Sequence, residues 1–277
     1  MLRRSLALQG SCLAMLSRTA LKRGLAVLDR RAPARGLTIL IYHRIGGESR
    51  DELDVPLSEF ERQLELLGGH DVVGLDAALD ALEVGDDAPR FVLTFDDGFA
   101  DVHEHAFPLL RARKLPFTLY IPTAYIGGEL GWEGSSAQAT GHALNWEQLG
   151  ELASSPLCTL GNHTHTHARP ERLTASELDD CSTALAERLG VVPRHFAFPW
   201  GIPVPSMEGE LRARFRSAVT GKIGRNQPGG DLMRLKRVPV RRTDPIEFFA
   251  AKLRGGLLAE HSYSAAVATA KGLGARA

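Results

Sequence analysis

The residues best suited to chemistry are carboxylates and histidines gathered at two points of the chain. Asp96 and Asp97 directly follow an apolar run, so their side chains point in different directions and can take different roles. One carboxylate can ligate a metal while the other stays free as a base. Further along, His163, His165 and His167 lie within five residues.

If that histidine segment is helical, His163 and His167 share one face of the helix, and His165 points elsewhere. Together with Asp97, the two imidazoles would form a metal site with positions left open for water and substrate, as hydrolysis requires. The simpler alternatives are an Asp-Asp-Gly turn and a solvated cluster of histidines.

Two further clusters also end apolar runs. The run from His195 ends in Phe198-Pro199-Trp200-Gly201, which offers an aromatic wall and a backbone N–H that could stabilise an oxyanion. The run from Leu37 ends in Tyr42-His43-Arg44 and delivers a single histidine. A packed turn and a structural histidine are the alternatives at these two places.

The elements that must position these residues alternate between β-rich runs and helical patterns, which is typical of a parallel sheet. Seven expected strands over roughly 215 residues favour a (β/α) barrel over an open sheet, and they place the polar clusters at the C-terminal strand ends where barrel enzymes hold their reactive residues. The expected strands are Leu37–Tyr42, Arg90–Phe95, Phe117–Ile121, Cys158–Gly161, His195–Phe198, Arg216–Thr220 and Leu235–Val240.

Composition limits the class of protein. The chain has 277 residues, 44% of them hydrophobic and 24% charged, which suits a globular domain with a large core and argues against disorder. Cys12, Cys158 and Cys181 are an odd, widely spaced set, so we expect buried thiols rather than disulfides. The 33 basic and 33 acidic residues are unevenly placed, with basic blocks in 1–36 and 212–242. Phe215 is the single aromatic residue in the two blocks, so no nucleic-acid partner is expected.

We expect one domain over 37–255, a separate basic segment over 1–36 and a tail over 256–277. The segment 1–36 has leucines at helical spacing but is a poor signal peptide, because polar residues interrupt its apolar part. It could lie as an amphipathic helix on an anionic membrane surface, or pack on its own domain, and both readings stay open. The expected location is the cytoplasm or the inner-membrane surface, with secretion as an alternative.

Three ordered motifs resemble those of the polysaccharide deacetylases, the NodB-homology group of carbohydrate esterase family 4. They are Thr94-Phe-Asp-Asp-Gly98, His163-Thr-His-Thr-His167 and Phe198-Pro-Trp-Gly201. The resemblance runs from about Leu37 to about Phe249 and implies a distorted (β/α) barrel.

The resemblance also implies roles for individual residues. Asp97, His163 and His167 would bind a divalent metal, most often Zn²⁺ and sometimes Co²⁺ or Ni²⁺. Asp96 would be the general base, and the backbone N–H of Trp200 would help to hold the oxyanion.

The chain departs from the common family pattern at two points. A late histidine motif that supplies the general acid is missing, and Tyr42-His43 is similar to a subgroup in which an N-terminal histidine takes that role. Ala197 replaces the arginine that usually pairs with the base, and Arg237 is the candidate substitute. The expected substrate-binding residues are Tyr42, Trp146, Phe198, Pro199 and Arg237.

The resemblance implies a metal-dependent hydrolase that removes N-acetyl groups from N-acetylhexosamine units of a polysaccharide or glycolipid, by attack of a metal-bound water. The expected partner is therefore an N-acetylated carbohydrate such as an exopolysaccharide. The alternatives are an O-acetyl esterase, another C–N amide hydrolase, and a carbohydrate-binding protein without catalysis.

Overall fold

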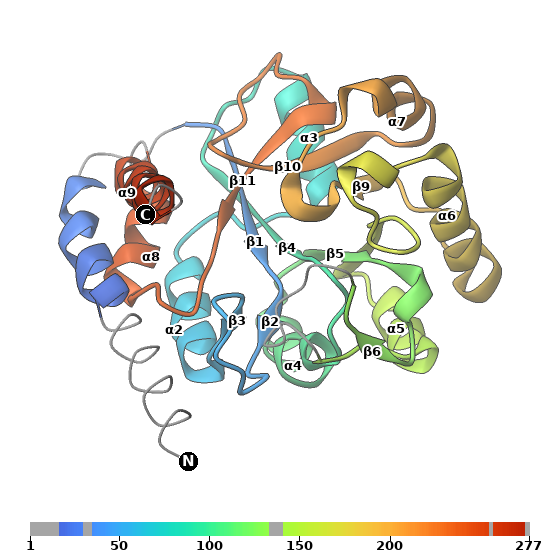
Figure 1. Cartoon of the computed structure of the whole chain (residues 1–277), viewed down its shortest axis with the longest axis horizontal. Helices are drawn as coiled ribbons and strands as arrows, with labels where there is room; N and C mark the ends of the chain where they lie inside the picture. The colour runs from blue at the N-terminus through green and yellow to red at the C-terminus, as the bar shows by residue number, and fades with distance from the viewer. Residues whose placement is uncertain (1–16, 30–34, 133–140, 255–256, 275–277) are drawn as a thin grey trace. The chain divides into compact units, whose positions relative to one another are not determined.

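The structure, a computed structural model, describes residues 17–29, 35–132, 141–254 and 257–274 (Figure 1). The chain divides into two compact units, one formed by 35–240 and the other by 1–34 together with 241–277. The division at residues 36 and 255 that the sequence suggests stays a prediction.

The larger unit is built on a closed barrel of seven parallel strands, which confirms the predicted fold class. Strand β1 closes the barrel, because it pairs with β4 from Leu37↔Arg90 to Tyr42↔Phe95 and with β11 at Leu40↔Val238. Around the barrel the strands are β1 (Leu37–Tyr42), β11 (Leu235–Pro239), β10 (Ser217–Ile223), β9 (His195–Ala197), β8 (Cys158–Asn162), β5 (Phe117–Ile121) and β4 (Arg90–Phe95).

The barrel is irregular on one side. Strands β8 and β9 share the single pair Asn162↔Phe196, and the register between β10 and β11 shifts between Val219 and Ile223. This irregularity matches the distorted barrel expected from the sequence.

The strands form because their side chains are apolar on both faces, as a parallel sheet covered by helices requires. All six residues of β1 are buried. Inside the barrel, Ile39, Val92 and Val219 form one buried cluster with Leu75 and Leu79 of helix α3 (Leu75–Glu83). This cluster fills the barrel interior and leaves the C-terminal strand ends for polar residues.

Helices of the larger unit follow the strands and bury one face each. Helix α6 begins after Thr174, whose hydroxyl caps the Glu177 N–H, and ends at Gly190 with φ 68°. The helices are α2 (Leu57–Leu67), α3 (Leu75–Glu83), α4 (Phe107–Ala112), α5 (Trp146–Ala153), α6 (Ala175–Leu189) and α7 (Glu208–Arg214). The larger unit also contains a π-helix (Val102–Ala106) and 3₁₀ turns at Thr123–Tyr125, Pro170–Arg172, Pro199–Gly201, Pro205–Met207 and Leu232–Arg234. Its short strands outside the barrel are β2 (Arg44–Ile45), β3 (Asp54–Val55), β6 (Glu129–Leu130) and β7 (Gly141–His142).

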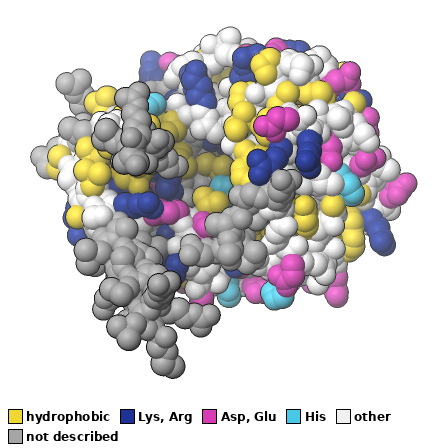
Figure 2. Space-filling model, viewed as in Figure 1, with side chains coloured by type: hydrophobic (Ala, Val, Ile, Leu, Met, Phe, Trp, Pro, Cys, Tyr) yellow, Lys and Arg dark blue, Asp and Glu magenta, His cyan; other side chains and the backbone are white. Residues whose placement is uncertain are grey.

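The basic block in 212–242 is interleaved with acidic side chains. Arg212 bonds Glu208 and Asp231, both at 2.7–2.8 Å, and Arg214 bonds Asp179 at 2.6 Å. On the face shown in Figure 2, basic and acidic side chains alternate rather than gather by sign.

The smaller unit combines the helix through residues 17–25 and the 3₁₀ turn Ala26–Asp29 with α8 (Ile246–Leu253) and α9 (Leu258–Gly274). Buried charges hold it together: Lys22 bonds Asp244 at 2.7 Å, Asp244 also bonds Lys252, and Lys252 lies 3.0 Å from Glu260. The described part of the basic N-terminal segment therefore packs against the C-terminal helices.

Two expectations concern single residues and membranes. Cys158 and Cys181 are free thiols, as expected, while Cys12 lies outside the described residues, as does 1–16 of the predicted amphipathic segment. Among the described residues, no helix combines the length and the apolar composition that crossing a bilayer requires.

We predict that Gly161→Ala destabilises the barrel. A Cβ at this position of β8 would overlap the buried ring of Tyr120 and lie 3.2 Å from the carbonyl oxygen of His195. Overpacking of this kind costs about 1–3 kcal/mol, which urea denaturation should report. The control is Gly150→Ala in α5, where the nearest atom, on Leu189, is 3.9 Å away; equal stability of the two variants would contradict the prediction.

Candidate active site and metal centre

The polar clusters converge at the C-terminal end of the barrel, as the sequence predicts. Asp96 and Asp97 follow the end of β4, His163 follows β8, and His43 follows β1. These residues line one cavity of about 360 Å³.

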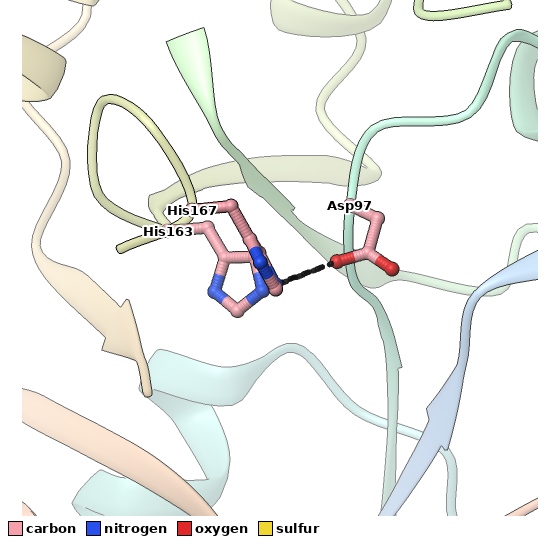
Figure 3. A group of neighbouring side chains, drawn as sticks. All are labelled: Asp97, His163 and His167. Carbon is pink, nitrogen blue, oxygen red and sulfur yellow. Dashed lines mark ion pairs between the residues drawn. The ribbon is translucent and has the colours of Figure 1, made fainter. Parts of the chain in front are cut away.

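The centre of this cavity is a candidate metal site. One ligand atom from each of Asp97, His163 and His167 lies within 4.8 Å of the others. Atom Nε2 of His163 is 3.3 Å from Oδ1 of Asp97, and Nε2 of His167 is 3.4 Å from the same oxygen (Figure 3). All three side chains are buried. A carboxylate with two imidazoles is a donor set that suits a divalent transition metal and leaves positions open.

The pKa values of the two histidines shift in opposite directions. Burial acts to lower the pKa of His163, but the hydrogen bond to Asp97 raises it above its usual value. Burial acts to raise the pKa of Asp97, but hydrogen bonds from His163 and His167 hold that pKa well below its usual range. Burial lowers the pKa of His167 and so favours the neutral, ligating imidazole. The Nδ1 of His163 donates to the carbonyl oxygen of Ala197 at 2.8 Å, which fixes the orientation of the ring with Nε2 toward Asp97.

The segment that carries the histidines is a turn, so His163 and His167 do not share the face of a helix. Thr164 and His167 have φ of 64° and 52°, so the chain turns through the left-handed region twice. The Asn162 side chain accepts from the Thr164 N–H, and the Thr164 hydroxyl accepts from the Ala168 N–H, both at 2.9 Å. This turn brings His163 and His167 together, while His165 bonds Thr123.

Backbone strain concentrates at the site. Asp97 has φ 76° and Trp200 has φ 62°, and His167 shares the left-handed conformation. Such conformations cost of order 1–3 kcal/mol each in residues other than glycine and persist only where the surroundings impose them. The surrounding structure therefore imposes the backbone conformations of Asp97, His167 and Trp200.

Asp96 and Arg237 form a buried, bidentate ion pair. The Nη1 of Arg237 lies 2.7 Å from Oδ1 of Asp96, and its Nη2 lies 2.7 Å from Oδ2. The Arg237 side chain is 1% exposed and the Asp96 side chain is 4% exposed. The Arg237 Nε donates to the Thr220 carbonyl oxygen at 3.1 Å, which fixes the fork. Burial acts to raise the pKa of Asp96, but the charge of Arg237 holds it below its usual value. Arg237 thus contacts the carboxylate as expected of a substitute for the missing arginine at Ala197.

Of the other expected site residues, His43 and Trp200 line the cavity and Tyr42 does not. Successive strand residues face opposite sides, so Ile41 and His43 point into the cavity while Tyr42 points outward. The Tyr42 ring is buried beside Phe95, at a centroid distance of 5.3 Å.

Phe198, Pro199 and Trp146 are also absent from the residues that line this cavity. Phe198 is buried against Phe196, with ring centroids 5.1 Å apart. Trp146 is the first residue of α5, and its ring lies 5.4 Å from the Arg188 guanidinium. Core packing and the start of a helix account for the positions of these aromatic residues, and their expected contact with substrate stays a prediction.

Several cavity residues escaped the sequence reasoning. Arg44 bonds Asp101 at 2.8 Å and lies over the Phe99 ring at 4.7 Å, and its position directly after His43 was an available signal. Trp132 stacks on His167 with ring centroids 3.8 Å apart. No periodic pattern in the sequence surrounds Trp132, so nothing marked it in advance.

Comparisons with known proteins agree with the geometry. Residues 84–211 match the family model of the polysaccharide deacetylases. The solved structure of IcaB from Ammonifex degensii is 32% identical with a TM-score of 0.68, and the match covers 80% of this chain and 98% of that one. YxkH of Bacillus subtilis is 30% identical over 156 residues, which are 55% of this chain and 50% of YxkH.

A third relative is the poly-β-1,6-N-acetyl-D-glucosamine N-deacetylase of Escherichia coli K12, 27% identical over 145 residues. The match covers 48% of this chain and 21% of the relative, so the chain spans half or less of the length of these two curated relatives. The family model and the near-complete match to IcaB, with the predicted motifs around one cavity, show that this chain belongs to the polysaccharide deacetylase family.

Proposed function

We propose that the protein is a metal-dependent hydrolase that removes N-acetyl groups from N-acetylhexosamine units of a polysaccharide or glycolipid. The observation that carries the proposal is the buried Asp97–His163–His167 set beside Asp96, a carboxylate that its arginine partner keeps ionised. The E. coli relative named above acts on poly-β-1,6-N-acetyl-D-glucosamine, which supports a poly-N-acetylhexosamine as the substrate class.

Asp97, His163 and His167 would hold the metal, with Zn²⁺ favoured by the two imidazoles and Co²⁺ or Ni²⁺ as alternatives. A divalent ion bound there supplies Lewis acidity, which lowers the pKa of water and polarises the acetamide carbonyl. The chain's own residues carry the proton transfers.

Asp96 accepts the proton of the attacking water, because its low pKa keeps the carboxylate ionised and ready. The backbone N–H of Trp200, in the turn after β9, stabilises the developing oxyanion. A C–O bond forms as the C–N bond breaks, so the sugar nitrogen leaves with its electron pair and needs a proton. His43 on the cavity wall is placed to donate it, which yields acetate and a free amine.

We predict that His163→Ala abolishes both metal uptake and deacetylation. The variant lacks one of the three ligands, so metal content measured by mass spectrometry and amine release from a panel of N-acetylated glycans and lipid-linked sugars should fall together. The matched control is His165→Ala, whose imidazole bonds Thr123 outside the ligand set. Full amine release by His163→Ala would refute the assignment, and a metal-loaded wild type that releases acetate only from esters would favour an O-acetyl esterase.

We predict that His43→Ala keeps the metal and loses rate. Removing a general acid typically costs about 10²–10⁴-fold, because an amide nitrogen is a very poor leaving group when unprotonated. The measurement is kcat for amine release alongside metal content. A wild-type kcat in this variant would assign the proton donor elsewhere.

We predict that Arg237→Gln moves the acidic limb of the pH–rate profile to higher pH. Activity falls with decreasing pH as Asp96 becomes protonated, and removing the cation that lowers its pKa raises that pKa. Arg237→Lys keeps one positive charge and should give an intermediate profile. Unchanged limbs in both variants, with unchanged metal content, would show that Asp96 is not the base.

A further inference from the structure

The two candidate histidine ligands are held in different ways. A metal-bound histidine usually donates its second ring N–H to a carbonyl or carboxylate, which fixes the orientation of the ring. His163 follows this rule through its bond to the Ala197 carbonyl oxygen. The Nδ1 of His167 is buried and has no hydrogen-bond partner among the described residues.

Aromatic rings pack against the His167 imidazole. The Trp132 ring stacks on the His167 imidazole with centroids 3.8 Å apart and planes 25° apart. The Trp200 ring lies on His167 at 5.4 Å with a tilt of 58°, and Tyr125 meets the edge of Trp132 at 5.6 Å. The imidazole of His167 is therefore oriented by aromatic contact.

Trp132 follows β6, in a segment that is fixed to the chain just after Asp97. The Leu144 N–H donates to the Gly98 carbonyl oxygen at 2.9 Å, and the Gly127 N–H donates to the Leu144 carbonyl oxygen at 2.9 Å. Leu130 packs against the buried Phe99. These contacts thus anchor the β6–β7 hairpin to the segment that carries Asp97, one of the two segments with candidate ligands.

The connection between β5 and α5, which contains β6 and β7, is also hydrogen-bonded to the segment that carries His163 and His167. The Ala124 N–H donates to the His165 carbonyl oxygen at 2.8 Å, and the Tyr125 hydroxyl donates to the Thr166 carbonyl oxygen at 3.2 Å. The connection between β5 and α5 therefore joins both segments that carry ligands.

We propose that Trp132 is a positioning residue that holds the His167 imidazole in its ligating orientation, in place of the usual hydrogen bond. The proposal rests on the metal site of the proposed function. It makes the β6–β7 hairpin part of the metal site although the hairpin supplies no ligand.

The test compares the affinity for Zn²⁺ of four proteins by competition with a chromophoric chelator. Loss of a group that orients a ligand typically weakens metal binding about 10- to 100-fold, which we expect for Trp132→Ala. Trp132→Phe keeps an aromatic face and should recover most of the affinity. Trp146→Ala, which removes the tryptophan beside Arg188, should bind Zn²⁺ like the wild type.

Wild-type Zn²⁺ affinity in Trp132→Ala would overturn the proposal, even if kcat/KM for a glycan falls, because Trp132 would then contact substrate alone. Equal loss of affinity in Trp132→Phe and Trp132→Ala would also overturn it, since an aromatic face would not suffice. A wild-type protein that takes up no Zn²⁺, Co²⁺ or Ni²⁺ would instead refute the metal dependence of the proposed function, which separates the two failures.

Discussion

The buried ion pair between Asp96 and Arg237 is the constraint on which the site depends. Both groups are almost fully buried, so neither could remain charged there without the other. The two parallel hydrogen bonds demand one geometry, and they fix β11 relative to the end of β4 across β1, which lies between them. The ion pair therefore keeps Asp96 charged and at the same time connects β4 to β11 across β1.

The candidate metal site also contains strained backbone. Asp97 and His167 adopt left-handed conformations that their side chains disfavour, and surrounding hydrogen bonds hold them. The ring of Trp132, from the neighbouring β6–β7 hairpin, packs on the His167 imidazole and adds to the support that the hydrogen bonds give. The C-terminal end of the barrel and the β6–β7 hairpin together position the candidate ligands Asp97, His163 and His167.

The sequence predicted the barrel because strands buried on both faces are nearly continuous apolar runs with polar residues at one end. Asp97, His163 and His167 were predictable for the same reason, since C-terminal strand ends meet. A helix at 163–167 was one way for His163 and His167 to share a face. Side chains of Asn162 and Thr164 stabilise a left-handed turn there instead, and this turn also brings the two imidazoles together. Trp132 was not predictable, because its contact with His167 depends on how a distant hairpin folds back.

The separation of the ion-pair partners also matters while the chain is being made. Asp96 and Arg237 are 141 residues apart, and Arg237 lies on the last strand of the barrel to be synthesised. A chain that has reached only residue 230 therefore lacks the guanidinium that pairs with the Asp96 carboxylate, and burial without that partner raises the pKa of the carboxyl group. Non-local contacts of this kind form late in folding. The Asp96–Arg237 pair is therefore completed only after the last strand of the barrel has been made, later than the segments that carry Asp97, His163 and His167.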